Sequence, residues 1–315
     1  MEEVKRLRKL GITRVEIGVQ SVYNDVLKAN RRGHDVQATI NATRLLKNAG
    51  FKVSYQMMPN LPGSSFKRDI KMFEEIFSDP RFKPDLLKIY PLALLKEAPL
   101  YKKYLRGEYK PYNKEKLIKL LIEIKQKIPN WCRIQRVIRD ISAKDIVEGG
   151  VKTSNLREIV QDRMAKMNLK CKCIRCREIR NNYDPKEKIY LFREDYEASQ
   201  GREIFLSFEN KKRSKLFALL RLRINRETEE IPFVVLKKSA IIREIHTYGA
   251  TTPVGEKPLS AQHKGLGKKL IEKAEKIAKR EFGLKKIVAI SGIGVREYFR
   301  KFSYRLENTY MAKRL

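Results

Sequence analysis

Several residue types are scarce in this 315-residue chain. Cysteine occurs four times, too rarely for a disulfide-stapled scaffold in a chain long enough to bury ample core. No apolar run approaches the roughly 20 residues that span a bilayer, and the start, Met-Glu-Glu-Val-Lys, resembles neither a signal nor a transit peptide. Asp and Glu number 37 against 70 Lys and Arg. The formal charge of +33 predicts a polyanionic partner, nucleic acid first, and we expect a soluble cytoplasmic protein with no membrane partner.

A glycine-bearing turn separates a predicted strand at 240–248 from a predicted helix that ends near Phe282. The turn reads Gln262-His263-Lys264-Gly265-Leu266-Gly267-Lys268. Glycines let backbone N–H groups close around a ligand and the helix N-terminus favours an anion, so the turn suits a phosphate or pyrophosphate. A tight turn without a ligand explains two glycines equally well. A nucleotide P-loop is excluded, because neither Ser nor Thr follows Lys268.

The turn resembles the Gln/Arg-x-x-Gly-x-Gly/Ala signature of the GNAT acetyltransferases. The resemblance implies that residues 262–268 bind acetyl-coenzyme A, together with Ile245 and Thr247 of the preceding strand. His263 either touches the cofactor or faces solvent.

Strands and helices alternate over residues 1–97. We expect a helix ending at residue 10, strands at 13–21, 51–58 and 86–90, and helices at 36–48 and 65–77. This order predicts a parallel sheet with right-handed crossovers. Functional residues of such sheets lie at the carboxyl ends of the strands, so Gln20, Asn60 and Lys88 would line one rim. They could equally be polar residues that merely end strands.

Three segments of this region resemble the radical SAM part of the Elongator catalytic subunit family: Glu16-Ile17-Gly18-Val19-Gln20-Ser21, Met57-Met58-Pro59-Asn60-Leu61-Pro62-Gly63 and Leu87-Lys88-Ile89-Tyr90-Pro91. The resemblance implies a partial (β/α) barrel with S-adenosylmethionine (SAM) bound near Gln20 and with Lys88 in the catalytic machinery. Such enzymes hold a 4Fe-4S cluster on three cysteines near the first strand. No cysteine precedes Cys132. We therefore expect an N-terminally truncated form that lacks the cluster ligands and part of the SAM site.

Arginines recur every third residue at Arg133, Arg136 and Arg139, after a lysine-rich helical stretch at 98–128. A helix or turn would group these guanidinium groups on one side, whereas a strand would scatter them. Grouped guanidinium groups suit phosphate, although a solvated face with salt bridges is the alternative. We expect a nucleic-acid surface here that also includes Arg175 and Arg177.

Three of the four cysteines form a Cys-x-Cys-x-x-Cys cluster at Cys171, Cys173 and Cys176. Three thiolates at this spacing can bind one zinc ion, and a structural zinc site needs a fourth ligand. The remaining cysteine, Cys132, is the predicted fourth ligand. The alternative is that Cys132 is simply a small buried apolar residue.

Strand alternation begins near residue 188. We expect strands at 189–192, 203–208, 216–224, 233–236, 240–248, 286–290 and 304–313, and a short helix at 295–302. The order of elements resembles a GNAT domain. The predicted architecture is α/β and multidomain: a partial radical SAM barrel at 1–97, a helical linker with the zinc site and basic surface at 98–188, and a GNAT domain with a mixed sheet at 189–315.

The GNAT resemblance implies two catalytic candidates. Tyr298 lies in the helix that carries the family's tyrosine, which reprotonates the thiolate leaving group. The family's Tyr-x-x-x-Gly pattern would instead place its tyrosine at Phe299 and its glycine at Ser303, a departure that puts the role of Tyr298 in question. Glu244 is either a general base or a surface carboxylate.

Taken together, these parts resemble the Elongator protein 3 family over essentially the whole chain. The resemblance implies a tRNA wobble-uridine acetyltransferase. In the full-length enzyme, SAM and the 4Fe-4S cluster would generate a radical from the acetyl group of acetyl-coenzyme A. This radical would then add to C5 of the uridine. Accessory Elongator subunits are the further expected partners. Two other functions stay open: a conventional GNAT protein lysine acetyltransferase, and an RNA-binding scaffold without catalysis.

Overall fold

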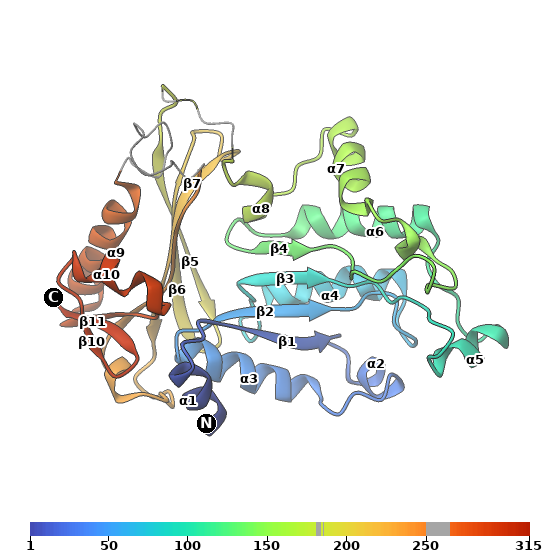
Figure 1. Ribbon diagram of the computed structural model, residues 1–315, viewed down its shortest axis with the longest axis horizontal. Helices are drawn as coiled ribbons and strands as arrows, with labels where there is room; N and C mark the ends of the chain where they lie inside the picture. The colour runs from blue at the N-terminus through green and yellow to red at the C-terminus, as the bar shows by residue number, and fades with distance from the viewer. Residues whose placement is uncertain (181–183, 185, 250–264) are drawn as a thin grey trace. The chain divides into compact units, whose positions relative to one another are not determined.

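The computed structural model describes residues 1–180, 184, 186–249 and 265–315 (Figure 1). The chain forms two compact units. The first unit comprises Met1–Val15, Asn41–Val53 and Arg177–Leu315, and the second comprises Glu16–Ile40 and Ser54–Cys176. These boundaries differ from residues 97 and 188, where the sequence suggested them. Within the described ranges, no helix is both long and apolar enough to cross a membrane.

A four-stranded sheet has the strand order β1 (Arg14–Gln20), β2 (Lys52–Met57), β3 (Leu86–Ile89) and β4 (Arg133–Arg136). β2, β3 and β4 pair in parallel, as the alternation of strands and helices predicted. All four arrows point the same way in Figure 1. Their carboxyl ends therefore share one rim, the edge where α/β proteins place functional residues.

The predicted helices at 36–48 and 65–77 are confirmed, and the lysine-rich stretch forms two helices rather than one, interrupted at Gly107 and Pro111. The helices up to residue 177 are α1 (Glu2–Lys9), α2 (Asn24–Ala29), α3 (Val36–Asn48), α4 (Phe66–Ser78), α5 (Leu100–Leu105), α6 (Lys114–Lys127), the short 3-10 helix η1 (Gly150–Lys152), α7 (Leu156–Lys166) and α8 (Ile174–Arg177). α4 packs on α6. Side chains cap both: Ser65 accepts from the N–H of Arg68, and Asn113 accepts from that of Lys116.

The first unit contains a seven-stranded mixed sheet, as expected. Its strands are β5 (Tyr190–Ala198), β6 (Gly201–Glu209), β7 (Leu216–Asn225), β8 (Ala240–Thr247), β9 (Lys286–Ala289), β10 (Arg305–Glu307) and β11 (Tyr310–Arg314), in the order β10-β11-β9-β8-β7-β6-β5. β8 and β9 are parallel, whereas the pairs on either side are antiparallel. Helix α9 (Leu266–Phe282) packs on β6 to β9 (Figure 1). Its buried face forms the core with the sheet.

Two segments of this unit that were predicted as single strands have other structures. Residues 233–236 end in a 3-10 helix, η2 (Val234–Leu236), in which Val234 is 80% exposed. Apolar character alone suggested a strand there. Residues 304–313 form the hairpin β10–β11, with Asn308 at a φ of +56° in the turn. The short 3-10 helix η4 (Ile293–Val295) and helix α10 (Arg296–Arg300) complete the unit.

Buried charges join residues 41–53 to the seven-stranded sheet. Glu203 is fully buried and forms ion pairs with Arg223 at 3.0 Å, Arg243 at 2.8 Å and Lys47 at 3.8 Å. Arg243 also donates to the carbonyl of Phe51. Because removing one partner would leave uncompensated buried charge, this cluster fixes the end of α3 against the sheet.

Candidate functional site

Three elements of the first unit meet where α9 begins. Gly265 caps the helix at a φ of +66° and offers no side chain to the first-turn N–H groups. Such groups have no intrahelical acceptor, and the helix dipole favours an anion beside them. A Cβ added at Gly267 would lie 2.4 Å from Tyr298 Oη of α10 and 3.7 Å from Thr247 Cγ2 at the end of β8. The start of α9, the Thr247 side chain and the phenol of Tyr298 therefore converge at one point.

Strand β8 extends beyond the end of β9 before it reaches this point. Its pairing with β9 runs from Ala240 to Ile242, whereas β8 itself continues to Thr247. The register with β7 shifts beside Arg243, and such a bulge bends the strand that carries it. Ile245 and Thr247 lie half-buried on the continuing part. Their backbone groups are placed to bond an extended ligand in the position that β9 would otherwise take.

The structure describes only the second half of the predicted pyrophosphate turn. Gln262, His263 and Lys264 lie outside the described residues. Leu266 and Gly267 are buried at the start of α9, and exposed Lys268 has its Nζ 3.9 Å from Glu272 Oε1. The glycines and the helix start therefore lie where an anion-binding turn requires them.

Tyr298, and not residue 299, faces this site. Phe299 is 2% exposed and packs its ring 5.4 Å from that of Tyr304, whereas Tyr298 is 37% exposed. Partial burial raises the pKa of Tyr298. The phenol therefore keeps its proton at neutral pH and can donate it to a developing thiolate.

Glu244 is held in ion pairs. Its carboxylate lies 2.8 Å from Arg221 Nε and 3.2 Å from Lys52 Nζ. Burial opposes ionisation, but the charges of Lys52 and Arg221 outweigh it and lower the pKa of Glu244 to about 2. A carboxylate that weakly basic is a poor proton acceptor, so the contacts suit a structural role better than the general base suggested by sequence.

A row of polar side chains crosses the four-stranded sheet. Lys88 Nζ of β3 lies 2.5 Å from Glu16 Oε2 of β1, and Gln56 Nε2 of β2 donates to the same oxygen at 3.2 Å. Gln56 is the register partner of Lys88, and Arg136 of β4 lies opposite Lys88 on the other side. Sequence reasoning named Lys88 but missed Glu16 and Gln56. The signal was a polar residue within each apolar strand, four positions before Gln20 and Asn60.

Gln20 is the last residue of β1, and Asn60 lies in the loop three residues after β2; both have left-handed backbone conformations. Their φ angles are +64° and +68°, in the left-handed region that side chains disfavour, and they are 7% and 6% exposed. Gln20 Oε1 is buried and has no hydrogen-bond partner among the described residues. Such an atom at a strand's carboxyl end suits a ligand that supplies the missing donor.

Three cysteines form a metal-compatible group. The Sγ atoms of Cys171, Cys173 and Cys176 all lie within 4.8 Å of one another, at the start of α8. Hydrogen bonds from the other two thiols and the charge of Lys125 lower the pKa of Cys176. Lys125 Nζ and Gln161 Nε2 each lie 3.7 Å from Cys176 Sγ. Neither was predicted, because nothing distinguishes them in their polar helices.

Among the described residues, the metal-compatible group comprises three cysteines and does not include Cys132, the predicted fourth ligand. It is fully buried just before β4, and its carbonyl accepts the N–H of Ile174 at 2.9 Å. Its backbone therefore supports the loop that carries the cluster. Its side chain fits the alternative interpretation, a small buried residue.

The arginine triplet is not helical, contrary to the expected grouping. Arg133 and Arg136 lie on β4, where buried Cys132 and Ile134 alternate with more exposed neighbours. This two-residue alternation outweighed the three-residue spacing of the arginines. Arg133 is half-buried, whereas Arg136, which pairs with Asp140, and Arg139 are exposed.

The two predicted arginines of the cysteine segment differ in exposure. Arg175 is half-buried and donates to the carbonyl of Gln135 at 3.2 Å. Arg177 is 5% exposed and forms an ion pair with Glu209 at 2.5 Å. A buried and paired guanidinium cannot bind phosphate at the surface, so Arg177 does not belong to the predicted interface.

Comparison with known proteins defines the class first. The family model described as the radical SAM superfamily matches residues 1–76, and the radical SAM C-terminal domain matches residues 84–166. This chain thus has an α/β radical SAM fold in its N-terminal half.

The solved structure of archaeal Methanocaldococcus infernus Elp3 with an N-terminus deletion (1–46) is 48% identical, with a TM-score of 0.91, covering 100% of this chain and 75% of that one. The tRNA uridine(34) acetyltransferase of the same organism is 48% identical over 328 residues, 100% of this chain and 60% of the relative. Elongator complex protein 3 of Schizosaccharomyces pombe is 42% identical over 318 residues, 99% of this chain and 58% of the relative. The chain belongs to the Elongator protein 3 family. It spans about three fifths of the length of these curated relatives.

Proposed function

We propose that this chain is the acetyl-coenzyme A-binding and tRNA-binding part of a tRNA wobble-uridine acetyltransferase, which builds a carboxymethyl group at C5 of the uridine. The observation that carries the proposal is the 48% identity, over the whole chain, to a tRNA uridine(34) acetyltransferase. The charge of +33 supports a tRNA partner. The relatives named Elongator complex protein 3 support accessory subunits as further partners.

The first unit acts as a GNAT domain in this proposal. The N–H groups at Gly265 to Lys268 would bind the pyrophosphate of acetyl-coenzyme A, and the part of β8 around Ile245 and Thr247 would bond its extended arm. The orientation of Tyr298 toward Gly267 supports this assignment. Bound acetyl-coenzyme A would supply an activated acetyl group, and the phenol of Tyr298 would donate its proton to the sulfur that leaves.

The rim of the four-stranded sheet would face SAM. Gln20, whose Oε1 is buried and unpartnered among the described residues, fits a donor group of this cofactor. Lys88, oriented by Glu16, would act near the reacting groups. The radical SAM cluster requires three thiolates near the first strand, and residues 1–131 contain no cysteine. These residues therefore do not fit that cluster, and the side chains of the rim support binding steps only.

The cysteine group would hold a structural zinc ion. Three thiolates supply three tetrahedral ligands, and the group as described does not include Cys132. The N–H groups of Lys125 and Gln161 lie near Cys176 Sγ, the outer contacts that orient metal-bound thiolates. The exposed guanidinium groups of Arg136 and Arg139 would contact tRNA phosphate.

A binding and turnover experiment tests the proposal. We expect acetyl-coenzyme A to bind this chain, and tRNA to stimulate its hydrolysis. We expect the full-length protein, reconstituted with its cluster, to modify tRNA. If tRNA changes neither the binding nor the hydrolysis of acetyl-coenzyme A, and the full-length protein leaves tRNA unmodified, the proposal fails. Acetyl transfer to a peptide lysine without tRNA would favour a protein acetyltransferase, and absence of cofactor binding would favour an RNA-binding scaffold.

A further inference from the structure

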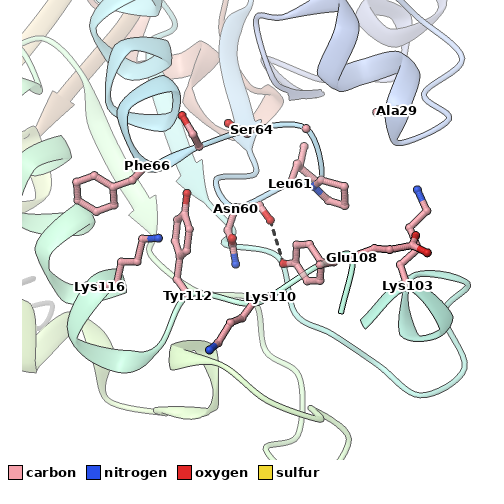
Figure 2. A pocket seen from close by; sticks show the side chains of 14 residues that line it. Ala29, Asn60, Leu61, Ser64, Phe66, Lys103, Glu108, Lys110, Tyr112 and Lys116 are labelled. Carbon is pink, nitrogen blue, oxygen red and sulfur yellow. Dashed lines mark hydrogen bonds between the residues drawn. The ribbon is translucent and has the colours of Figure 1, made fainter. Parts of the chain in front are cut away.

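A pocket of about 470 Å³ opens in the second unit, beside the loop that follows β2 (Figure 2). Residues 60–66 and the segment from Lys103 to Lys116 supply most of its lining. Its size is within the usual range for a small-ligand site. None of the predicted cofactor, metal or arginine residues lines it.

The rim of the pocket is cationic. Lys103, Lys110 and Lys116 line it and are exposed, and none forms an ion pair within the part of the chain that the structure describes. Glu108 also lines the pocket, but its carboxylate lies 2.5 Å from Arg106 Nε. The hydrogen bond from Arg106 lowers the pKa of Glu108, so its charge is matched locally. The three lysines leave net positive charge for an anionic ligand.

The amide of Asn60 points into the pocket beside Tyr112 (Figure 2). Its backbone is fully engaged: the N–H donates to Asp69 at 2.8 Å, and the carbonyl accepts from Tyr109 Oη at 3.0 Å. Its side chain is more than nine-tenths buried and forms no hydrogen bond with a described residue. The amide therefore offers both a donor and an acceptor to a ligand.

Helix α4 begins at the same wall. Ser64, Ser65 and Phe66 line the pocket, so the positive end of a 13-residue helix is directed at it. Asp69 lies in the first turn of α4, and its carboxylate accepts hydrogen bonds from the Asn60 N–H, Ser64 Oγ and Tyr112 Oη. The start of α4 therefore adds to the attraction that the lysines exert on an anion.

A fixed aromatic ring forms another wall. Tyr112 is held through its hydroxyl, 3.0 Å from Asp69 Oδ2, and by an edge-to-face contact with Phe66 at 6.2 Å. Lys116 Nζ lies 4.3 Å from the centre of the Tyr112 ring. Tyr112 is 8% exposed, so its ring offers a small apolar surface beside the ammonium groups, a combination with which proteins bind a base and its phosphate.

We propose that this pocket binds one nucleotide of the substrate RNA, its phosphate on the lysines and the start of α4 and its base on Tyr112 and Asn60. The proposal rests on the proposed tRNA substrate and adds a second recognition point for it. The same chemistry would bind a free nucleoside monophosphate, so the experiment must separate the two sources.

Four single variants test the pocket, with a matched control. Asn60→Gly removes the amide and keeps the left-handed backbone, because glycine adopts a φ near +68° without strain. Asn60→Asp places a carboxylate where we expect the nucleotide. Lys103→Ala and Lys110→Ala each remove one lining charge. Lys102→Ala is the control, since Lys102 is an exposed neighbour of Lys103 that does not line the pocket.

Binding of tRNA is measured by fluorescence anisotropy between 50 and 200 mM salt, the range in which phosphate contacts are most evident. We expect Lys103→Ala and Lys110→Ala to weaken binding about three- to tenfold and to reduce the salt slope by about 1 each. Asn60→Asp should weaken binding more than Asn60→Gly, and Lys102→Ala should change it less than about twofold. Pocket variants that match Lys102→Ala in affinity and slope would overturn the proposal and leave the proposed function standing.

Titration with uridine 5′-monophosphate separates the sources. If the native chain binds no tRNA, its proposed function fails. The titration with uridine 5′-monophosphate then decides by itself whether the pocket binds a nucleotide. Binding of uridine 5′-monophosphate, but not uridine, that is lost in Asn60→Asp then supports a free nucleotide as the ligand. Absence of binding overturns the pocket. Circular dichroism of each variant shows whether the fold is retained.

Discussion

The close approach of Tyr298 to Gly267 predicts what an added methyl group would do. The GNAT signature accepts either Gly or Ala at this position, but a Cβ at Gly267 would lie 2.4 Å from Tyr298 Oη, well inside van der Waals contact. The phenol must then turn away. Because Tyr298 is a partly exposed side chain, the movement costs little stability, and Ala in a helix gains up to about 1 kcal/mol over Gly.

We therefore expect the free energy of unfolding of Gly267→Ala to lie within about 1 kcal/mol of that of the native protein. Acetyl-coenzyme A affinity should fall about tenfold, the equivalent of ~1.4 kcal/mol, because the displaced ring enters the space beside Thr247. Isothermal titration with acetyl-coenzyme A measures the affinity, and urea unfolding measures the stability.

A second substitution makes this reasoning refutable. In Tyr298→Phe the nearest ring atom would be the one corresponding to Cζ, 3.6 Å from the added Cβ, an ordinary contact. The double variant Gly267→Ala/Tyr298→Phe should recover affinity to within about twofold of Tyr298→Phe alone. Native affinity in Gly267→Ala, or a double variant as weak as Gly267→Ala, would refute the clash as the cause.

The remaining predictions concern the metal, the buried carboxylate and the basic surface. Metal analysis should find about one zinc ion per chain. We expect the zinc to be absent in Cys173→Ser and retained in Cys132→Ala. Equal zinc content in the two variants, or no zinc in the native chain at any pH, would contradict the three-cysteine site. The pKa of Glu244 is about 2 in the folded state, below its ordinary value of 4.5. The ionised carboxylate therefore stabilises the fold above pH 4.5, and this contribution is lost as the pH falls toward 2. Glu244→Gln should therefore cost about 3 kcal/mol in urea unfolding at pH 7 and much less near pH 3, and a pH-independent cost would exclude the ion pairs as its source. Arg136→Ala/Arg139→Ala should weaken tRNA binding and flatten its salt dependence by up to about 2, whereas an unchanged slope would remove both from the interface.

Local patterns predicted the elements well where one signal dominated. Helix α3 occupies the predicted 36–48, since helical periodicity and the Gly50 terminator agree there. At β4 two signals conflicted, and the pairing of Ile134 with Leu87 of the sheet outweighed the arginine spacing. Packing against a neighbouring strand is a tertiary effect that spacing along the chain does not contain.

Contacts between distant segments were beyond sequence reasoning. Glu203 pairs with Lys47, more than 150 positions away, and nothing local marks either residue as fully buried. Glu16, Gln56 and Lys88 form one row only because the register of three strands aligns them. Tyr298 shows the same limit: the family pattern placed the tyrosine one residue later, but the packing of Phe299 against Tyr304 turns position 298 toward α9.

The residues Gln20 and Asn60 connect the fold to its function. Glycine would adopt the left-handed conformation at either position without strain; of the two residues present, asparagine tolerates it better than glutamine. Each retains an amide in that conformation, more than nine-tenths buried, with Gln20 Oε1 lacking a described partner and the Asn60 amide directed into the pocket. A buried amide without a hydrogen-bond partner among the described residues is satisfied when a ligand bonds it. We therefore propose that both residues are recognition points, Gln20 for the cofactor and Asn60 for a nucleotide.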